Sequence, residues 1–101
     1  MNNKQIGTEL LTKKHAVIFD VIKNTKRKFG ILGAFKIGDC VVISFAKTRM
    51  GDTFDTRTGL GIACIRANRI AKEHKAYHLP FCMTEKIDEM YTRAQKYFKT
   101  D

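Results

Sequence analysis

The sequence predicts an α+β protein in which an N-terminal antiparallel β-meander of about three strands is followed by two C-terminal helices. Three observations support this prediction. A chain of 101 residues has the length of one domain, so residues 1–101 are treated as a single domain. A hydrophobic content of 44% and a single proline are typical of a folded chain. Apolar residues form β-type runs in the first half and recur at helical spacing in the second.

Three apolar runs separated by turn residues occupy the first half of the chain. Residues 15–22 are β-branched and aromatic, which predicts the first strand. The polar residues 23–28 predict a hairpin loop, and residues 29–37 predict a strand that its glycines weaken or bulge. Gly38 and Asp39 predict a turn before the clearest strand, residues 40–46. The mostly polar residues 1–13 are expected to form a loose arm or a short helical turn.

Two helices are predicted after a polar loop, residues 47–58. The first helix carries one stripe of small and apolar side chains, formed by Leu60, Ala63, Cys64, Ala67, Ile70 and Ala71. Ile62 and Ile65 project from another side, which the second helix, a homo-oligomeric partner or a ligand could cover. Thr84 is the expected N-cap of the last helix. The apolar face of that helix consists of Ile87, Met90, Tyr91, Ala94, Tyr97 and Phe98.

The charge balance favours an anionic partner. Lys and Arg number 19 against 10 Asp and Glu, which gives a net charge of +9. Nucleic acid, nucleotides and acidic protein surfaces would all be attracted by a field of this sign. No apolar run is long enough to cross a bilayer and no signal peptide is recognisable, which predicts a cytoplasmic protein without a membrane partner. An odd set of cysteines, Cys40, Cys64 and Cys82, is then expected to be reduced.

A cluster of three adjacent cations, Lys26, Arg27 and Lys28, lies in the predicted hairpin loop. Phosphates would relieve the repulsion among these charges and release counterions, so the cluster is a candidate nucleic-acid contact. It is equally well explained as a solvated loop that keeps the sheet soluble, because no aromatic alternation of the RNA-recognition type accompanies it.

Four arginines form the second candidate site around the loop and the helix that follows it. A guanidinium group grips phosphate or carboxylate at two points and also stacks on bases. The competing interpretation is ion pairing with Asp52, Asp55 and Glu73. Because the arginines outnumber these carboxylates, we favour a ligand site with an aromatic and apolar wall. Its predicted residues are Arg49, Phe54, Arg57, Ile62, Arg66 and Arg69.

Catalytic chemistry is not indicated by the sequence. Asp52 and Asp55 precede a predicted helix, where capping and turn formation explain them. The glycines of 58–63 superficially resemble a dinucleotide fingerprint, but a polar loop rather than a strand leads into them. These glycines are better explained by tight packing, although the amides of the helix N-terminus could still bind a phosphate. No cysteine lies at ligand spacing from a histidine, so we expect no metal, no cofactor and no enzymatic activity.

Residues 51–67 carry the pattern GDxFDxxxGxxIAxxRA, formed by Gly51, Asp52, Phe54, Asp55, Gly59, Ile62, Ala63, Arg66 and Ala67. This pattern resembles one found in small phage and prophage proteins. With the predicted architecture, it is also similar to the first class of Thoeris anti-defence proteins, which are phage-encoded sponges. The resemblance implies an oligomer that traps cyclic ADP-ribose signals, or in some members cyclic oligonucleotides, without cleaving them.

The function predicted from these observations is that of a phage counter-defence protein, active in the host cytoplasm as a homo-oligomer. It would sequester an anionic cyclic nucleotide without cleaving it. Two alternatives remain open at this point. One is a basic nucleic-acid-binding module centred on Lys26, Arg27 and Lys28, and the other is an inhibitor that docks on an acidic host protein.

Overall fold

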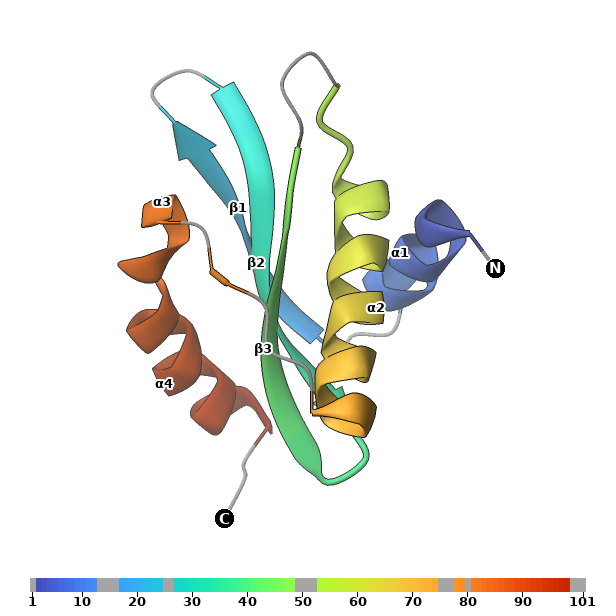
Figure 1. Cartoon of the computed structure of the whole chain (residues 1–101), viewed down its shortest axis with the longest axis vertical. Helices are drawn as coiled ribbons and strands as arrows, with labels where there is room; N and C mark the ends of the chain where they lie inside the picture. The colour runs from blue at the N-terminus through green and yellow to red at the C-terminus, as the bar shows by residue number, and fades with distance from the viewer. Residues whose placement is uncertain are drawn as a thin grey trace.

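A three-stranded antiparallel sheet forms the middle layer of the computed structural model, with helices on both faces (Figure 1). The structure describes residues 2–12, 17–24, 27–48, 53–74, 78–79 and 81–98. The strands are β1 (Val17–Asn24), β2 (Arg27–Ile37) and β3 (Cys40–Lys47). The helices are α1 (Asn3–Thr12), α2 (Thr56–Glu73), the short α3 (Phe81–Thr84) and α4 (Ile87–Phe98). The predicted α+β class, with a meander followed by C-terminal helices, is confirmed.

The strands pair in chain order, β1-β2-β3, so β2 is central and β3 is an edge strand. Gly38 has a positive φ of 61° in the turn between β2 and β3, a conformation that glycine adopts without strain. The register shifts after Ile22, which pairs with Gly30, whereas Lys23 pairs with Lys28. Phe29 is therefore an extra residue on β2, and the bulge expected in this strand lies at its start.

Both faces of the sheet are apolar because successive side chains alternate between two cores. The core on one face joins the sheet to α2 and consists of Val17, Ile31, Phe35, Ala46, Leu60, Ala63 and Ala67. The core on the other face joins it to α3 and α4 and consists of Ile22, Leu32, Ala34, Met83, Met90, Ala94 and Phe98. Since α4 packs on the far face, it does not cover the outer side of α2.

Helix α1 packs against the outer side of α2, and glycines allow the close approach (Figure 1). A Cβ atom on Gly7 would overlap the backbone carbonyl of Arg57, and one on Gly61 would overlap the carbonyl of Asn3. The turn of α1 from Asn3 to Gly7 therefore lies antiparallel against the turn of α2 from Arg57 to Gly61. Leu10 adds an apolar contact with the core under α2.

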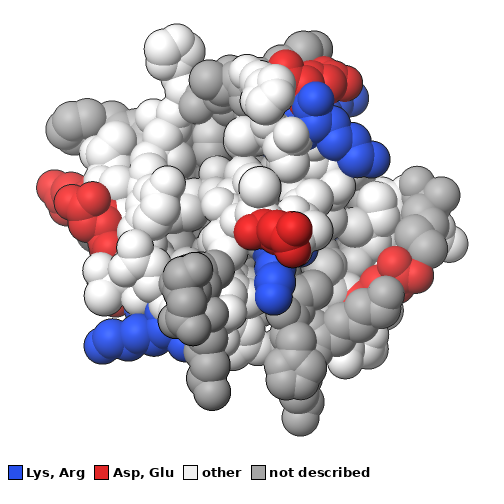
Figure 2. Space-filling model, turned by 90° about the horizontal axis from the view of Figure 1, so that it is seen from below, with Lys and Arg blue, Asp and Glu red and all other residues white. Residues whose placement is uncertain are grey.

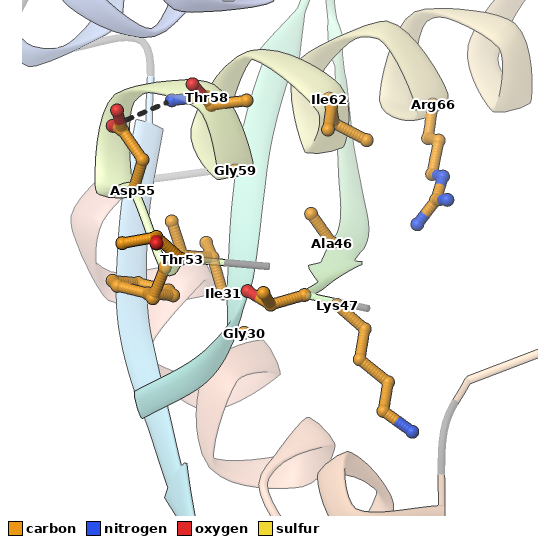
Figure 3. A pocket seen from close by; sticks show the side chains of 12 residues that line it. Gly30, Ile31, Ala46, Lys47, Thr53, Asp55, Thr58, Gly59, Ile62 and Arg66 are labelled. Carbon is orange, nitrogen blue, oxygen red and sulfur yellow. Dashed lines mark hydrogen bonds between the residues drawn. The ribbon is translucent and has the colours of Figure 1, made fainter. Parts of the chain in front are cut away.

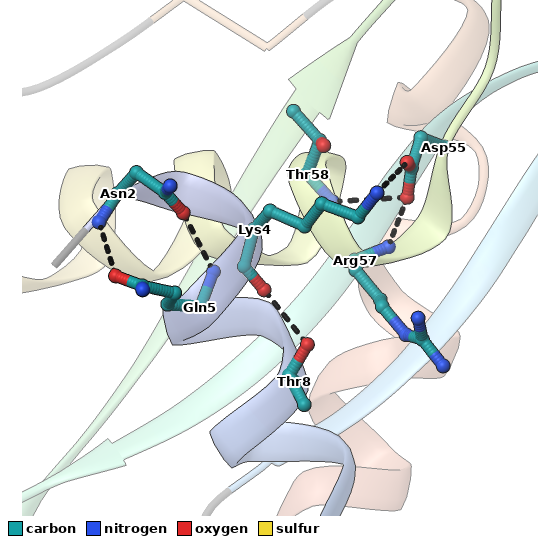
Figure 4. A network of polar contacts seen from close by, with 7 residues as sticks. All are labelled: Asn2, Lys4, Gln5, Thr8, Asp55, Arg57 and Thr58. Atoms are coloured by element: carbon teal, nitrogen blue, oxygen red, sulfur yellow. Dashed lines mark hydrogen bonds and ion pairs between the residues drawn. The ribbon is translucent and has the colours of Figure 1, made fainter.

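The N-terminal residues form a full helix where a loose arm or a short helical turn was expected. A reciprocal capping box begins it: the Asn2 side chain accepts the Gln5 amide at 2.9 Å, and the Gln5 side chain accepts the Asn2 amide at 3.0 Å (Figure 4). These bonds satisfy two amides that the helix itself leaves unpaired.

The sequence predicted the N-cap of α2 correctly but not the start of α4. Asp55 caps α2 as expected, and His74 closes its C-terminus in the left-handed region with φ 55°. Thr84 does not cap the last helix, because it belongs to α3 and α4 begins only at Ile87. An ion pair of 2.6 Å from Arg93 to Asp20 ties α4 to β1.

We expect Gly61→Ala to destabilise the protein by about 1–3 kcal/mol or more, because the added methyl group forces α1 away from α2. Urea unfolding at constant m value measures this loss. The matched control is Gly59→Ala on the same helix, whose Cβ would meet the flexible end of Ile31 at 3.1 Å. Equal free energies of unfolding for the two variants would contradict the tight α1–α2 contact.

Candidate functional site

A pocket of about 640 Å³ opens between the start of β2, the end of β3 and the N-terminal half of α2. Its volume falls within the range of small-molecule sites. The start of β2 lies beside the end of β3 because the two strands are antiparallel. Residues 53–55, which precede α2, form another side of the pocket. The lining residues are Gly30, Ile31, Ala46, Lys47, Thr48, Thr53, Phe54, Asp55, Thr58, Gly59, Ile62 and Arg66.

The pocket has two chemically different sides (Figure 3). Asp55 and the hydroxyl-bearing Thr53 and Thr58 lie on one side, whereas Arg66 and Lys47 lie on the other. The apolar side chains of Ile31, Ala46 and Ile62 lie between them. Lys47 is exposed at the mouth, and its side chain points away from Arg66 in this view.

Arg66 lines the pocket and also forms a hydrogen bond with the backbone of β3, an edge strand of the sheet. Its guanidinium donates to the backbone carbonyl of Phe45 at 3.0 Å and lies 5.0 Å from the centre of the Phe45 ring. Phe45 packs with the core under α4, so Arg66 reaches around the edge strand from the α2 side. This contact combines a charge-assisted hydrogen bond with a cation–π interaction. Arg66 is therefore partly a structural residue.

Asp55 occupies the anion-binding position at the N-terminus of α2. One oxygen, Oδ1, accepts the backbone amides of Arg57 at 2.9 Å and Thr58 at 3.3 Å (Figure 4). The backbone carbonyl of Asp55 accepts the Gly59 amide. These amides are the donors that a bound phosphate would need. The chain's own carboxylate thus already accepts two of the amides that were expected to be able to hold a phosphate.

The pKa of Asp55 lies below its ordinary value of 3.8, chiefly because the Thr58 amide hydrogen bond stabilises the carboxylate. The Arg57 amide and the positive charges of Lys4 and Arg57 lower the pKa further, and partial burial opposes them. Lys4 of α1 lies 3.8 Å from Oδ2. Asp55 is thus a fixed negative charge in the pocket wall at neutral pH.

The glycines that superficially resemble a dinucleotide fingerprint have packing roles, as expected. Gly59 lies against the Ile31 side chain, and Gly61 lies against the backbone of α1 at Asn3. At these positions α2 is packed between β2 on one side and α1 on the other. The contact with α1 leaves no room for a side chain at Gly61.

The pocket brings together three of the six predicted ligand residues, Phe54, Ile62 and Arg66. Arg57 and Arg69 do not line it: both are exposed, and Arg69 lies on the outer side of α2 beside Ile65. The structure therefore does not bring these two arginines to the pocket with Arg66. Arg49 lies outside the described residues.

The basic cluster of the alternative nucleic-acid site falls at the β1–β2 hairpin. Lys26 lies outside the described residues. Arg27 and Lys28 form the start of β2, where they pair with Asn24 and Lys23 of β1, and the structure describes only their backbone. Phe29 packs with the core under α4.

Nine of the twelve lining residues were not among the predicted ligand residues, and four of these nine are Lys47, Thr48, Thr53 and Thr58. These four lie in or next to the loop between β3 and α2. Because that loop must return the chain from a strand end to a helix start, residues at its two ends are brought close together. The position of these residues near the ends of the loop is therefore the sequence feature that could have identified them.

Among the described residues that line the pocket there is no cysteine and no histidine. Burial raises the pKa of the Cys64 thiol, while a bond from Asn68 acts against this shift, so the thiol is neutral at pH 7. Within the described ranges, no three His, Cys, Asp or Glu residues are grouped so that they could hold a metal ion.

The end of the molecule away from the pocket mixes both signs of charge. Figure 2 shows that acidic and basic side chains are interspersed among the described residues on this face. No helix in the described part of the chain combines the length and apolar character that a membrane span requires. Comparisons with protein-family models, curated proteins and solved structures find no significant match to this chain.

We expect Arg66→Ala to destabilise the protein by about 1–3 kcal/mol, because it removes both contacts with Phe45. Chemical denaturation measures this loss. Arg57→Ala is the control at an exposed position of the same helix and should change the free energy of unfolding by less than about 0.5 kcal/mol. An unchanged denaturation midpoint for Arg66→Ala would show that its contacts do not stabilise the fold.

The lowered pKa of Asp55 predicts an acid-dependent contribution to stability. The unfolded chain binds the proton more tightly, so this contribution is present above pH 3.8 and is lost as the pH falls through the lower folded value. Asp55→Asn keeps a capping side chain without the charge. The gap in unfolding free energy between wild type and variant should therefore shrink below about pH 4. Parallel pH profiles would contradict this.

Proposed function

We propose that this protein binds a cyclic nucleotide signal of the cyclic ADP-ribose type in the pocket between β2, β3 and α2, and sequesters it without cleavage. The proposal depends on one observation: Phe54, Ile62 and Arg66, chosen from the sequence for this role, line one pocket of about 640 Å³. A nucleotide needs an apolar or aromatic wall for its base and positive charge for its phosphates. Both occur around this pocket.

Binding without turnover is supported by the ionisable groups that line the pocket. Asp55 is the only residue with a carboxylate among the described residues that line the pocket. Hydrogen bonds from the α2 amides keep this carboxylate in its charged form at neutral pH. A general acid or base must exchange protons near its working pH. A carboxylate with a lowered pKa and two amide hydrogen bonds is poorly suited to this task.

The resemblance of residues 51–67 to phage proteins supports the biological setting of the proposal. It implies a phage-encoded homo-oligomer that acts in the host cytoplasm against a defence signal. The net charge of +9 agrees with an anionic ligand because it raises the local concentration of such molecules.

Calorimetric titration with cyclic ADP-ribose tests the proposal. We expect saturable binding and, after denaturation of the complex, recovery of a ligand with unchanged mass. A chemically altered ligand would rule out sequestration, and the absence of binding would rule out this ligand class. Salt-sensitive binding of oligonucleotides alone would instead support the nucleic-acid module.

Phe54→Ala should weaken the binding of cyclic ADP-ribose by about tenfold or more, because base stacking on an aromatic ring contributes about 1–3 kcal/mol. Tyr91→Ala is the matched control, since Tyr91 is an exposed aromatic residue on α4, across the sheet. Melting curves of both variants confirm that they remain folded. Equal affinities of the two variants would exclude Phe54 from the site.

A further inference from the structure

We infer that two copies of this chain associate through the outer edge of β1, which pairs antiparallel with the same edge of the partner about Phe19. The inference rests on the proposed function in one respect, since it gives an interface to the homo-oligomer named there, but it does not involve the ligand. It follows from a difference between the two edge strands of the sheet, β1 and β3. The chain itself covers part of the β3 edge and leaves the β1 edge unpaired within the described residues.

The hydrogen bonds of the sheet determine which backbone groups of β1 point outward. The Phe29 carbonyl accepts the Thr48 amide, so the backbone of Phe29 faces β3. Backbone groups alternate between the two neighbours along an antiparallel strand, so the even-numbered residues of β2 from Gly30 onward bond to β1. Their partners in β1 also have even numbers, such as Asp20 opposite Leu32. The N–H and C=O groups that point away from the sheet therefore belong to Val17, Phe19, Val21 and Lys23.

These outward groups have no hydrogen-bond partner within the described part of the chain. The stretch Val17–Ile22 is apolar except for Asp20, and it contains no lysine or proline. Lysines, prolines and short length are the usual features that protect an edge strand against pairing, and β1 is eight residues long. The outer edge of β1 is thus of the kind to which a further strand adds.

The β3 edge, on the opposite side of the sheet, is blocked by a side chain of α2. The Arg66 guanidinium donates to the Phe45 carbonyl at 3.0 Å and lies 5.0 Å from the centre of the Phe45 ring. A strand that paired with β3 would have to displace this group. Lys47, exposed at the end of β3, adds a charge of the kind that protects edges. Of the two edges, β1 is therefore the one available for pairing.

The occupant that best fits the β1 edge is a second copy of the same edge. A two-fold axis across an antiparallel pair brings the N–H groups of each strand opposite the C=O groups of the other, so such an edge is complementary to itself. Pairing about Phe19 places Val17 opposite the partner's Val21. Three outward-facing pairs, with two hydrogen bonds each, then give about six backbone hydrogen bonds.

The charges along β1 favour this register. Pairing about Asp20 would set two carboxylates directly opposite each other, which is unfavourable. Pairing about Phe19 instead places each Asp20 opposite the partner's Ile18. Asp20 is already neutralised by Arg93 of α4 at 2.6 Å. Two copies of a chain with a net charge of +9 can therefore meet here without bringing like net charges together.

Sedimentation equilibrium tests the association. The intact wild-type chain should show a monomer–dimer equilibrium at concentrations up to about 0.1 mM. Val21→Lys should weaken dimerisation by about tenfold or more, because it adds an unpaired charge at the interface. Val42→Lys is the matched control, a half-buried valine on the same face of the sheet but on β3, and it should change the dissociation constant by less than about twofold. Circular dichroism verifies that both variants are folded.

Disulfide formation tests the register and needs no added charge. Phe19→Cys is combined with Cys40→Ser, because Cys40 is an exposed thiol. At the two-fold axis the two Cα atoms of position 19 would lie about 5.5 Å apart, within the range of a disulfide. Oxidation should link two copies through this position, as identified by mass spectrometry of the linked peptides. Asp20→Cys in the same background is the control and should not link, because position 20 lies off the axis.

Three outcomes would overturn the inference. They are a wild-type chain that stays monomeric, a dimer that Val21→Lys and Val42→Lys weaken equally, and linkage through Asp20→Cys but not through Phe19→Cys. Titration with cyclic ADP-ribose separates this inference from the proposed function, because the pocket is formed by β2, β3 and α2 and not by β1. A monomeric wild type that binds the nucleotide would overturn only the interface. A dimer that does not bind it would overturn only the proposed sequestration.

Discussion

The hydrogen bonds of one carboxylate determine how the pocket is built. Asp55 ends the segment before α2, satisfies two amides of the first helical turn, and faces the Lys4 ammonium of α1. The same side chain forms part of the pocket wall. Local helix initiation and the electrostatics of the site therefore depend on a single group. Because the residue that caps α2 also lines the pocket, a negative charge lies where many nucleotide-binding sites have unpaired backbone amides.

The glycines of α1 and α2 set the distance between these helices, and the sheet sets the position of α2. Gly7 and Gly61 bring the two backbones into contact, while Gly59 lets the helix rest on Ile31. With α2 held from both sides, the side chains of Ile62 and Arg66 reach the end of β3. The geometry of the pocket is thus a consequence of packing between elements that are distant in sequence.

The fold was largely predictable because each strand is an apolar run bounded by turn residues, and α4 has a regular apolar face. The full length of helix α1 was not predicted, and a loose arm was left open as an alternative, because its few apolar residues give a weak pattern. The reciprocal pair Asn2 and Gln5 was the usable signal for its start.

The candidate site was only partly predictable. Helical spacing places Arg66 and Arg69 on neighbouring positions, but it does not reveal which of them faces the edge of the sheet. The structure directs Arg66 to Phe45 and leaves Arg69 on the outer side of α2. Arg57 was expected to point at a ligand, whereas its backbone amide bonds to Asp55 and its side chain is exposed. The spacing of residues along one helix shows which side chains share a face, but it does not show how close each of them lies to the sheet.

The docking of α1 on α2 also determines the order in which the molecule can be completed during translation. Helix α1 (Asn3–Thr12) leaves the ribosome before α2, because its backbone partner, the turn from Arg57 to Gly61, is synthesised about fifty residues later. The meander can pair strand by strand as it emerges, because its neighbours are adjacent in sequence. Helix α1 must therefore wait for α2 before it can be buried, so it acquires its native contacts only after the meander that separates the two helices has been made.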